Sequence, residues 1–272
     1  MVKPQTTERL AGLLDFSRHS LPQPYGQWFL RRVLLRHPLR SISGIWRYLR
    51  QPQPDAGQHQ LTDSANTGFV PGAAADPTRL LVATGFCEKP LPLPGRHNGC
   101  PAGRFNHDCL YLDHLRLGPL AEATGEPACE DCLVRVLGQA ALRAGACFAI
   151  LTSALDIAKD VLLPALEEQR FARCLITLCP YSLEPMALAL SICHMDGYVM
   201  AFDTGTCADF HQWLRADQGI KLEQTTLPEE RARKIFHLLN SVAQLTPCPR
   251  ESAFFERKGN IYQPGAPGSV KQ

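Results

Sequence analysis

Four short apolar segments, separated by helical text, constrain the fold of this chain more than any other feature. Residues 80–85 (LLVATG), 147–151 (CFAIL), 174–178 (CLITL) and 198–202 (YVMAF) have the length and apolar content of buried strands. Helical periodicity lies between and after them, at residues 133–145, 154–170, 184–192, 208–217 and 228–245. Strands that alternate with helices favour parallel βαβ units, whose connections are right-handed. The sequence therefore predicts an α/β fold: a small three-layer core with a mostly parallel sheet of four or five strands.

Two prolines fall inside the predicted helices. Pro164 must kink the helix at 154–170 or begin a new one, because proline cannot donate the helical hydrogen bond. Pro185 is expected in the first turn of the helix at 184–192, where the missing N–H costs nothing.

Outside this core the composition predicts three further regions. Residues 1–50 form an N-terminal arginine-rich helical segment, and residues 51–78, in which Pro, Gly, Gln, Ala and Asp dominate, form a linker or long loop. Residues 249–272 form a flexible tail. The core itself, residues 79–248, is a cysteine-rich α/β metal-binding domain. Because no secretory signal and no run of about 18 apolar residues is visible, we expect a cytoplasmic protein with no membrane insertion.

The chain contains eleven cysteines, which is the second constraint. Cytoplasmic thiols are kept reduced, and an odd number excludes complete internal pairing, so no disulfide framework is expected. The remaining roles are metal ligands, redox thiols and inert buried residues that act as small hydrophobes.

The position of each cysteine relative to the strands separates these roles. Ligands of open parallel sheets bind beyond the carboxyl ends of the strands. Cys87, Cys179 and Cys207 each follow a predicted strand, whereas Cys147 and Cys174 begin one and are expected to be buried small hydrophobes. The sequence thus predicts a cysteine-lined crevice at one edge of the sheet. Hydroxyl groups at the strand ends would bind an anionic group of a substrate there: Thr152, Ser153, Ser182, Thr204 and Thr206.

A long irregular stretch after the first strand carries a further set of cysteines. Cys100 and Cys109 lie in text that contains Gly, Pro and Asn, and Cys129 and Cys132 form a CxxC pair whose sulfurs can reach one metal. Metal binding would supply the folding free energy that this loop lacks in apolar content. The predicted metal ligands are Cys87, Cys100, Cys109, Cys129 and Cys132 as the principal set, with Cys179 and Cys207 completing a second site or acting on substrate.

The spacing favours an iron–sulfur cluster, of the 4Fe-4S type, over zinc. Structural zinc sites usually show two close pairs of ligands, whereas this chain has one close pair and wide spacings elsewhere. Seven thiolates exceed one tetrahedral site. Either two centres exist, or some thiols carry out chemistry beside one centre; zinc is the alternative metal.

Cys207 is the candidate reactive thiol. It precedes the predicted helix 208–217, whose dipole would lower the pKa of the thiol, while Asp203 would oppose that shift; a plain ligand role for Cys207 is the alternative. Asp203 is the second candidate catalytic residue. Arg104, between two loop cysteines, could bind an anionic ligand, and His107 could ligate metal or shuttle protons; the alternative is that Arg104, His107 and Asp108 hold the loop by hydrogen bonds.

The N-terminal segment is cationic. Between Phe16 and Pro54 there are seven arginines and no acidic residue, with Trp28, Trp46 and other aromatic residues interleaved. This pattern fits RNA, an acidic partner or an anionic membrane surface. The alternative is a helical lid whose aromatic side chains pack on the core and whose arginines are solvated.

Residues 87–207 resemble a prokaryotic family of uncharacterised, cysteine-rich proteins presumed to bind iron–sulfur clusters. The residues that carry the resemblance are Cys100-Pro101-Ala102, the Cys129–Cys132 pair before a helix, Cys179 after a strand, and the run from Asp203 to Cys207. The family pattern has a further cysteine just after the CxxC, where this chain has Leu133. The resemblance implies an iron–sulfur centre and no particular activity.

Two hypotheses of function follow. The first is an iron–sulfur protein that carries out redox or sulfur-transfer chemistry on a small or RNA-borne substrate, with an electron donor or partner protein. The second is a zinc-stabilised, non-catalytic binding module whose arginine-rich N-terminal helices dock a partner.

Overall fold

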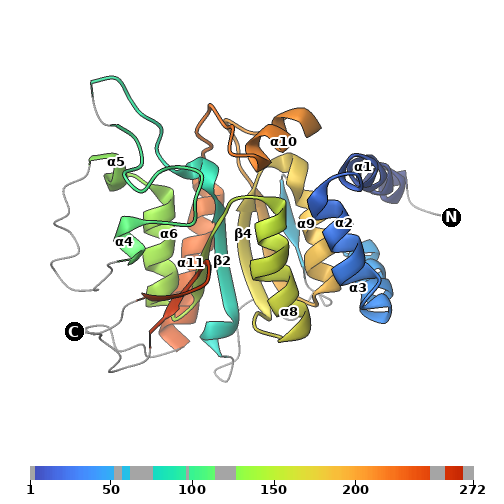
Figure 1. Ribbon diagram of the computed structural model, residues 1–272. Helices are drawn as coiled ribbons and strands as arrows, with labels where there is room; N and C mark the ends of the chain where they lie inside the picture. The colour runs from blue at the N-terminus through green and yellow to red at the C-terminus, as the bar shows by residue number, and fades with distance from the viewer. Residues whose placement is uncertain are drawn as a thin grey trace.

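The computed structural model describes residues 4–51, 57–61, 76–95, 98–113, 127–245 and 255–265. It shows three layers, with helices on both faces of a seven-stranded sheet whose order is β1-β5-β4-β2-β3-β7-β6 (Figure 1). The predicted fold class is confirmed, and the sheet has more strands than the four or five expected.

The centre of the sheet is parallel and consists of the four predicted strands. These are β2 (Leu80–Gly85), β3 (Cys147–Leu151), β4 (Arg173–Leu178) and β5 (Asp196–Ala201). Val82 of β2 lies opposite Phe148 of β3 and Leu175 of β4. Both faces of these strands are covered by helices, which is why their sequences are continuous apolar runs.

Three antiparallel strands at the edges were missed. Strand β1 (Gln58–Gln60) pairs with β5, and the hairpin of β6 (Phe255–Lys258) and β7 (Ile261–Pro264) pairs with β3. The predicted linker 51–78 and the predicted flexible tail 249–272 thus both contribute to the sheet. Their strands are short and largely polar, because edge strands need little apolar sequence; the rest of both regions lies mostly outside the described residues.

One face of the sheet is covered by α7 (Ala154–Ile157), the π-helical turn η5 (Ala158–Leu162), α8 (Leu163–Glu167) and α9 (Pro180–Ile192). The π turn precedes Pro164, so the predicted irregularity in this helix is present. The position expected for Pro185 was wrong. Helix α9 begins at Pro180, four residues earlier than the apolar periodicity indicates, and Pro185 lies inside it.

The opposite face is covered by α4 (Leu110–Asp113), α5 (Pro127–Glu130), α6 (Leu133–Arg143) and α11 (Glu229–Leu245). Their apolar side chains form one buried cluster with alternate residues of the strands, among them Val82 and Phe148. Helix α10 (Phe210–Asp217) lies at the end of the molecule where the parallel strands finish, as does the loop after β2 (Figure 1).

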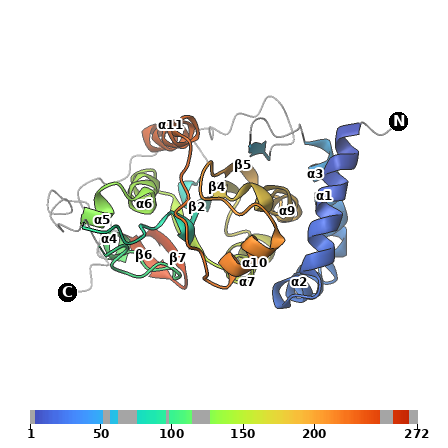
Figure 2. The same cartoon turned by 90° about the horizontal axis from the view of Figure 1, so that it is seen from above.

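The N-terminal segment forms α1 (Pro4–Ser20), α2 (Pro24–Phe29), the π turn η1 (Leu30–Leu34) and α3 (Pro38–Arg50), stacked beside α9 (Figure 2). Helix α3 approaches α9 so closely that a Cβ atom on Gly44 would lie 2.3 Å from the Cα atom of Ile192. Buried Arg47 pairs with Asp196 and donates to the carbonyl of Leu61. The segment is therefore a lid packed on the core, as the alternative interpretation of its sequence has it, but Trp46 is exposed and Arg47 is buried, which that interpretation did not predict.

Candidate functional site

The cysteines that follow the strands meet at the point where the order of the parallel strands reverses. The chain passes from β2 outward to β3 and then crosses back to β4, on the other side of β2. Ligands of doubly wound sheets bind in the crevice at such a switch point. Cys87 follows β2, within the short 3-10 helix η3 (Phe86–Glu88), and Cys179 directly follows β4.

We call Cys87, Cys179 and Cys207 the pocket group. The thiol of Cys179 is hydrogen bonded to those of both Cys87 and Cys207. All three residues are buried, and the ammonium of Lys221 lies 3.5 Å from the sulfur of Cys207. Residues that are distant in the sequence thus bring three thiols together, as the strand-end argument predicts.

Within this group the most acidic thiol is Cys87. Its hydrogen bond with Cys179 lowers the pKa of Cys87, against the burial that opposes it. The hydrogen bond with Cys207 lowers the pKa of Cys179, but the bond with Cys87 and burial outweigh it and raise that pKa to about 11. The pKa of Cys207 is raised by its bond with Cys179 and by burial.

The expectation that Cys207 has a lowered pKa at a helix N-terminus was therefore wrong. Helix α10 begins at Phe210 and is capped by the side chain of Asp209, which accepts a hydrogen bond from the amide of Gln212 at 2.9 Å. Cys207 precedes this cap, and the amides that would stabilise a thiolate are directed at Asp209 instead. The candidate reactive thiol is Cys87, which the sequence offered only as a metal ligand.

We call Cys100, Cys109, Cys129 and Cys132 the loop group. Cys109, Cys129 and Cys132 belong to one buried cluster beneath α6, with Cys132 as the N-cap of that helix. Cys100, Cys109 and Cys132 lie close enough that their thiolate forms would repel one another, and burial raises the pKa of Cys109 to about 12. Cys87, predicted to belong to this set, lies in the pocket group instead, because the turn after β2 directs it toward β4.

A buried lysine organises the loop group. Lys89 is 1% exposed, and its ammonium donates to the carbonyl oxygens of Gly103 (3.1 Å), Asn106 (3.0 Å) and Asp108 (2.8 Å), and to the side-chain amide oxygen of Asn106. All four acceptors are neutral. Burial lowers the pKa of Lys89, and the charges of Cys100, Cys109, Asp108 and Cys132 oppose that shift. Nothing in the sequence around Lys89 distinguishes it from a surface lysine.

Arg104 connects the loop group to the pocket group. Its guanidinium donates to the carbonyls of Cys87 (2.8 Å), Glu223 (2.6 Å), Lys89 (3.2 Å) and Lys221. These contacts occupy all three guanidinium nitrogens, so the loop-holding role is the one that the structure supports. Asp108 similarly pairs with Arg257, and the Nδ1 atom of His107 lies 2.8 Å from the carbonyl of Ile150.

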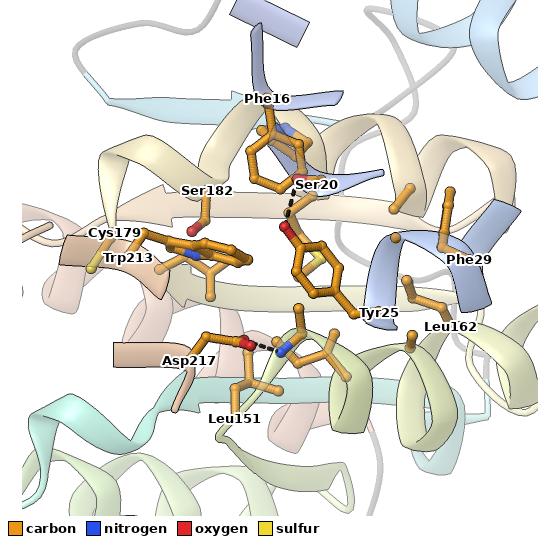
Figure 3. A pocket seen from close by; sticks show the side chains of 18 of the residues that line it. Phe16, Ser20, Tyr25, Phe29, Leu151, Leu162, Cys179, Ser182, Trp213 and Asp217 are labelled. Carbon is orange, nitrogen blue, oxygen red and sulfur yellow. Dashed lines mark hydrogen bonds between the residues drawn. The ribbon is translucent and has the colours of Figure 1, made fainter. Parts of the chain in front are cut away.

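An apolar cavity of about 290 Å³ opens beside the pocket group (Figure 3). Cys87, Cys179 and Cys207 all line it. Trp213 and Cys179 lie at one end of it and Phe29 of the N-terminal lid at the other, with Tyr25 of the lid between them. The rings of Trp213 and Tyr25 pack edge to face at 5.3 Å, which connects α10 to the lid.

Few polar groups face this cavity. They include the predicted residues Thr152 and Ser182, together with Asp217, whose carboxylate accepts a hydrogen bond from the amide of Ala154 at 2.5 Å. Burial raises the pKa of Asp217. A site with many apolar walls and few polar groups suits an apolar ligand that is oriented at one end.

The other predicted substrate-binding residues lie outside the cavity lining. Ser153 caps α7, accepting from the amide of Asp156 at 3.1 Å. The hydroxyl of Thr204 lies 2.6 Å from that of Thr226, and Asp203 is exposed. Asp203, Thr204 and Thr206 form the turn that leads to Cys207, and none of them lines the cavity.

The ten described cysteines are free thiols; Cys248 lies outside the described residues. Among the residues that the structure describes, no three or more His, Cys, Asp or Glu side chains are grouped in an arrangement that could hold a metal ion. Binding by either cysteine group would thus require its thiols to turn toward a common centre.

Comparisons with protein-family models, with curated proteins and with solved structures find no match to this chain. None of the helices in the described part of the chain combines the length and apolar character needed to cross a bilayer.

Proposed function

We propose that the loop group holds an iron–sulfur cluster of the 4Fe-4S type and that the pocket group carries out redox or sulfur-transfer chemistry on a small apolar substrate in the adjacent cavity. The observation that carries this proposal is the buried ammonium of Lys89 among the loop-group thiols.

A buried charge is costly unless an opposite charge compensates it. The hydrogen bonds of Lys89 go to neutral oxygens, and the carboxylate of Asp108 is paired with Arg257. Thiolates on Cys100, Cys109 and Cys132 would provide the missing negative charge. Burial raises the pKa of Cys109 and of Cys132, so these thiols become thiolates only when a metal replaces their protons.

The number of ligands supports the type of centre. Four cysteines make up the loop group, and four thiolates are what a 4Fe-4S cluster requires. The same number suits a structural zinc ion, and the wide spacing of Cys100 and Cys109 and the family resemblance favour iron–sulfur over zinc. A bound cluster would supply one-electron transfer to the site.

The pocket group would act on the substrate directly. Of the three thiols, Cys87 is the one whose pKa is lowered, and Cys179 lies within hydrogen-bonding reach of it. Two neighbouring thiols can release two electrons and two protons to a bound acceptor and become a disulfide. Ser182 and Thr152 would orient the polar end of the substrate.

The apolar walls favour a small molecule over an RNA-borne substrate, because Phe16, Tyr25, Phe29 and Trp213 leave little of the lining polar. The chemistry also needs an electron donor or partner protein to restore the thiols. Ten free cysteines suit the reducing cytoplasm, which is the compartment that we propose.

Anaerobic purification tests the proposal, with iron, acid-labile sulfide and zinc measured alongside the visible absorption spectrum. We expect iron and sulfide in similar amounts and a brown chromophore that dithionite bleaches. Stoichiometric zinc in a colourless protein would instead identify the zinc-stabilised binding module.

Paired variants then test the division into two groups. The double substitution Cys129→Ser/Cys132→Ser should remove the iron and sulfide, whereas Cys179→Ser/Cys207→Ser should retain both. Loss of the cluster in the second variant, with retention in the first, would place the metal on the pocket group and overturn the assignment.

A further inference from the structure

The lid exposes a continuous apolar stripe. Leu39, Ile42 and Trp46 of α3 are 81%, 59% and 59% exposed, and Leu35, just before α3, is 68% exposed. Leu39, Ile42 and Trp46 recur at intervals of three and four, which places them on one face of α3, and Leu35 lies in the turn before it. Exposed apolar side chains that line up in this way mark an interaction surface.

This face is held outward by the opposite face of the same helix. Ser41, Gly44 and Tyr48 are buried against the core, and Tyr48 donates to the carboxylate of Glu184 on α9. Rotating α3 to bury the stripe would break these contacts and the pairing of Arg47 with Asp196. The stripe is therefore exposed as long as the lid is packed on the core.

Arginines flank the stripe. Arg31, Arg32 and Arg50 are exposed, and the guanidinium of Arg50 lies 5.0 Å from the ring centroid of Trp46. The segment from Phe16 to Pro54 contains no acidic residue that would neutralise them. The surface thus combines apolar side chains, an exposed indole and exposed arginines.

We propose that α3 and the preceding turn dock on the surface of a bilayer that contains anionic lipids. An interfacial helix lies in the plane of the membrane, with apolar side chains among the acyl chains and arginines at the headgroups. Tryptophan prefers this boundary because its ring is apolar and its N–H is polar. The phosphate groups of the lipids provide negative charge, which residues 16–54 lack.

Other occupants match these observations less well. A second copy of the chain, docked through the same face, would bring two sets of arginines together without acidic partners. RNA would satisfy the arginines and one base would stack on Trp46, but Leu35, Leu39 and Ile42 offer its other bases no ring.

The docking surface also reaches the mouth of the cavity. Leu21 and Ile45 line the cavity and are 47% and 41% exposed, and Ile45 lies next to Trp46 in α3. An apolar ligand dissolved in the bilayer would reach the pocket group without crossing water. This last step rests on the proposed function; the docking itself does not.

Co-sedimentation with phosphatidylcholine vesicles, prepared with and without phosphatidylglycerol, tests the docking on the whole chain as purified. We expect binding only to vesicles that contain phosphatidylglycerol, weakened by salt. Leu39→Ser/Ile42→Ser and Arg31→Gln/Arg32→Gln should each reduce binding by about tenfold. The emission of Trp46 should shift to the blue on binding, and Trp46→Phe should remove that shift.

Matched controls keep the test specific. Leu222→Ser removes an apolar side chain that is 79% exposed, and Arg143→Gln/Arg233→Gln removes two exposed charges outside the lid; both should bind like the wild type. Equal binding by the Leu39→Ser/Ile42→Ser protein, or no binding of the wild type, would overturn the proposal. So would self-association that this double substitution abolishes. Iron and sulfide content, measured in parallel, tests the proposed function separately.

Discussion

The two cysteine groups lie at the same edge of one sheet but are built by different means. The pocket group is positioned by strand register: Cys87 and Cys179 follow neighbouring parallel strands, so the backbone hydrogen bonds of β2 and β4 bring their thiols together. The loop group is positioned by irregular chain around Lys89, and the segment that joins Cys109 to Cys129 lies mainly outside the described residues. A thiol set built on strands needs no metal to assemble, whereas a set built on loops gains its free energy from what it binds.

The largest expected effect separates the two groups by stability. Cys129→Ser/Cys132→Ser should lower the melting temperature by on the order of 10 °C, because lost metal binding is lost folding free energy. Cys87→Ala should lower it far less, since the sheet that positions Cys87 remains. Differential scanning calorimetry under anaerobic conditions measures both. Equal losses would show that the two groups fold as one unit.

The second effect concerns the buried ammonium. Lys89→Met should destabilise the protein by about 3 kcal/mol, because carbonyls that accepted charge-assisted hydrogen bonds lose their donor. The proposed cluster should also be lost faster to a chelator, since its compensating charge would be gone. Lys159→Met, at an exposed position, is the control. A chelation rate equal to that of the wild type would remove Lys89 from the metal site.

The contrast between the groups also explains which parts of the structure could be predicted from the sequence. The four parallel strands and the meeting of Cys87, Cys179 and Cys207 were predictable, because buried parallel strands have an apolar signature and their ends meet by topology. The edge strands β1, β6 and β7 were not, since their polar sequences resemble loops. Lys89 was missed for a similar reason: its burial depends on carbonyls that the folded loop supplies from 14 to 19 residues away.

The third effect concerns thiol reactivity. In the metal-loaded protein at neutral pH, N-ethylmaleimide should modify Cys87 first, because its pKa is lowered while burial raises the pKa of Cys147 to about 11 and of Cys193 to about 12. Mass spectrometry of labelled peptides identifies the site. Cys87→Ala should reduce early labelling by about tenfold, and Cys174→Ala should leave it unchanged. Early labelling of Cys207 would restore the original expectation for that residue.

The smallest expected effect comes from removing one tyrosine hydroxyl beside each cysteine group. Tyr25→Phe removes a hydroxyl that donates to Ser20 at 2.6 Å, beside the pocket group. Tyr262→Phe removes a hydroxyl that donates to the carbonyl of His107 and accepts from the amide of Cys109, each at 3.0 Å, beside the loop group. Each should lower the free energy of unfolding by about 1 kcal/mol, the usual net value of a hydrogen bond.

Their other consequences should differ. Tyr262→Phe frees the backbone of a proposed ligand and should speed cluster loss to a chelator, while Tyr25→Phe should not. Tyr25→Phe should alter the binding of an apolar fluorescent dye in the cavity, while Tyr262→Phe should not. If both variants changed both properties, the lid and the loop would be coupled through the core, and the pocket and loop groups would form a single site.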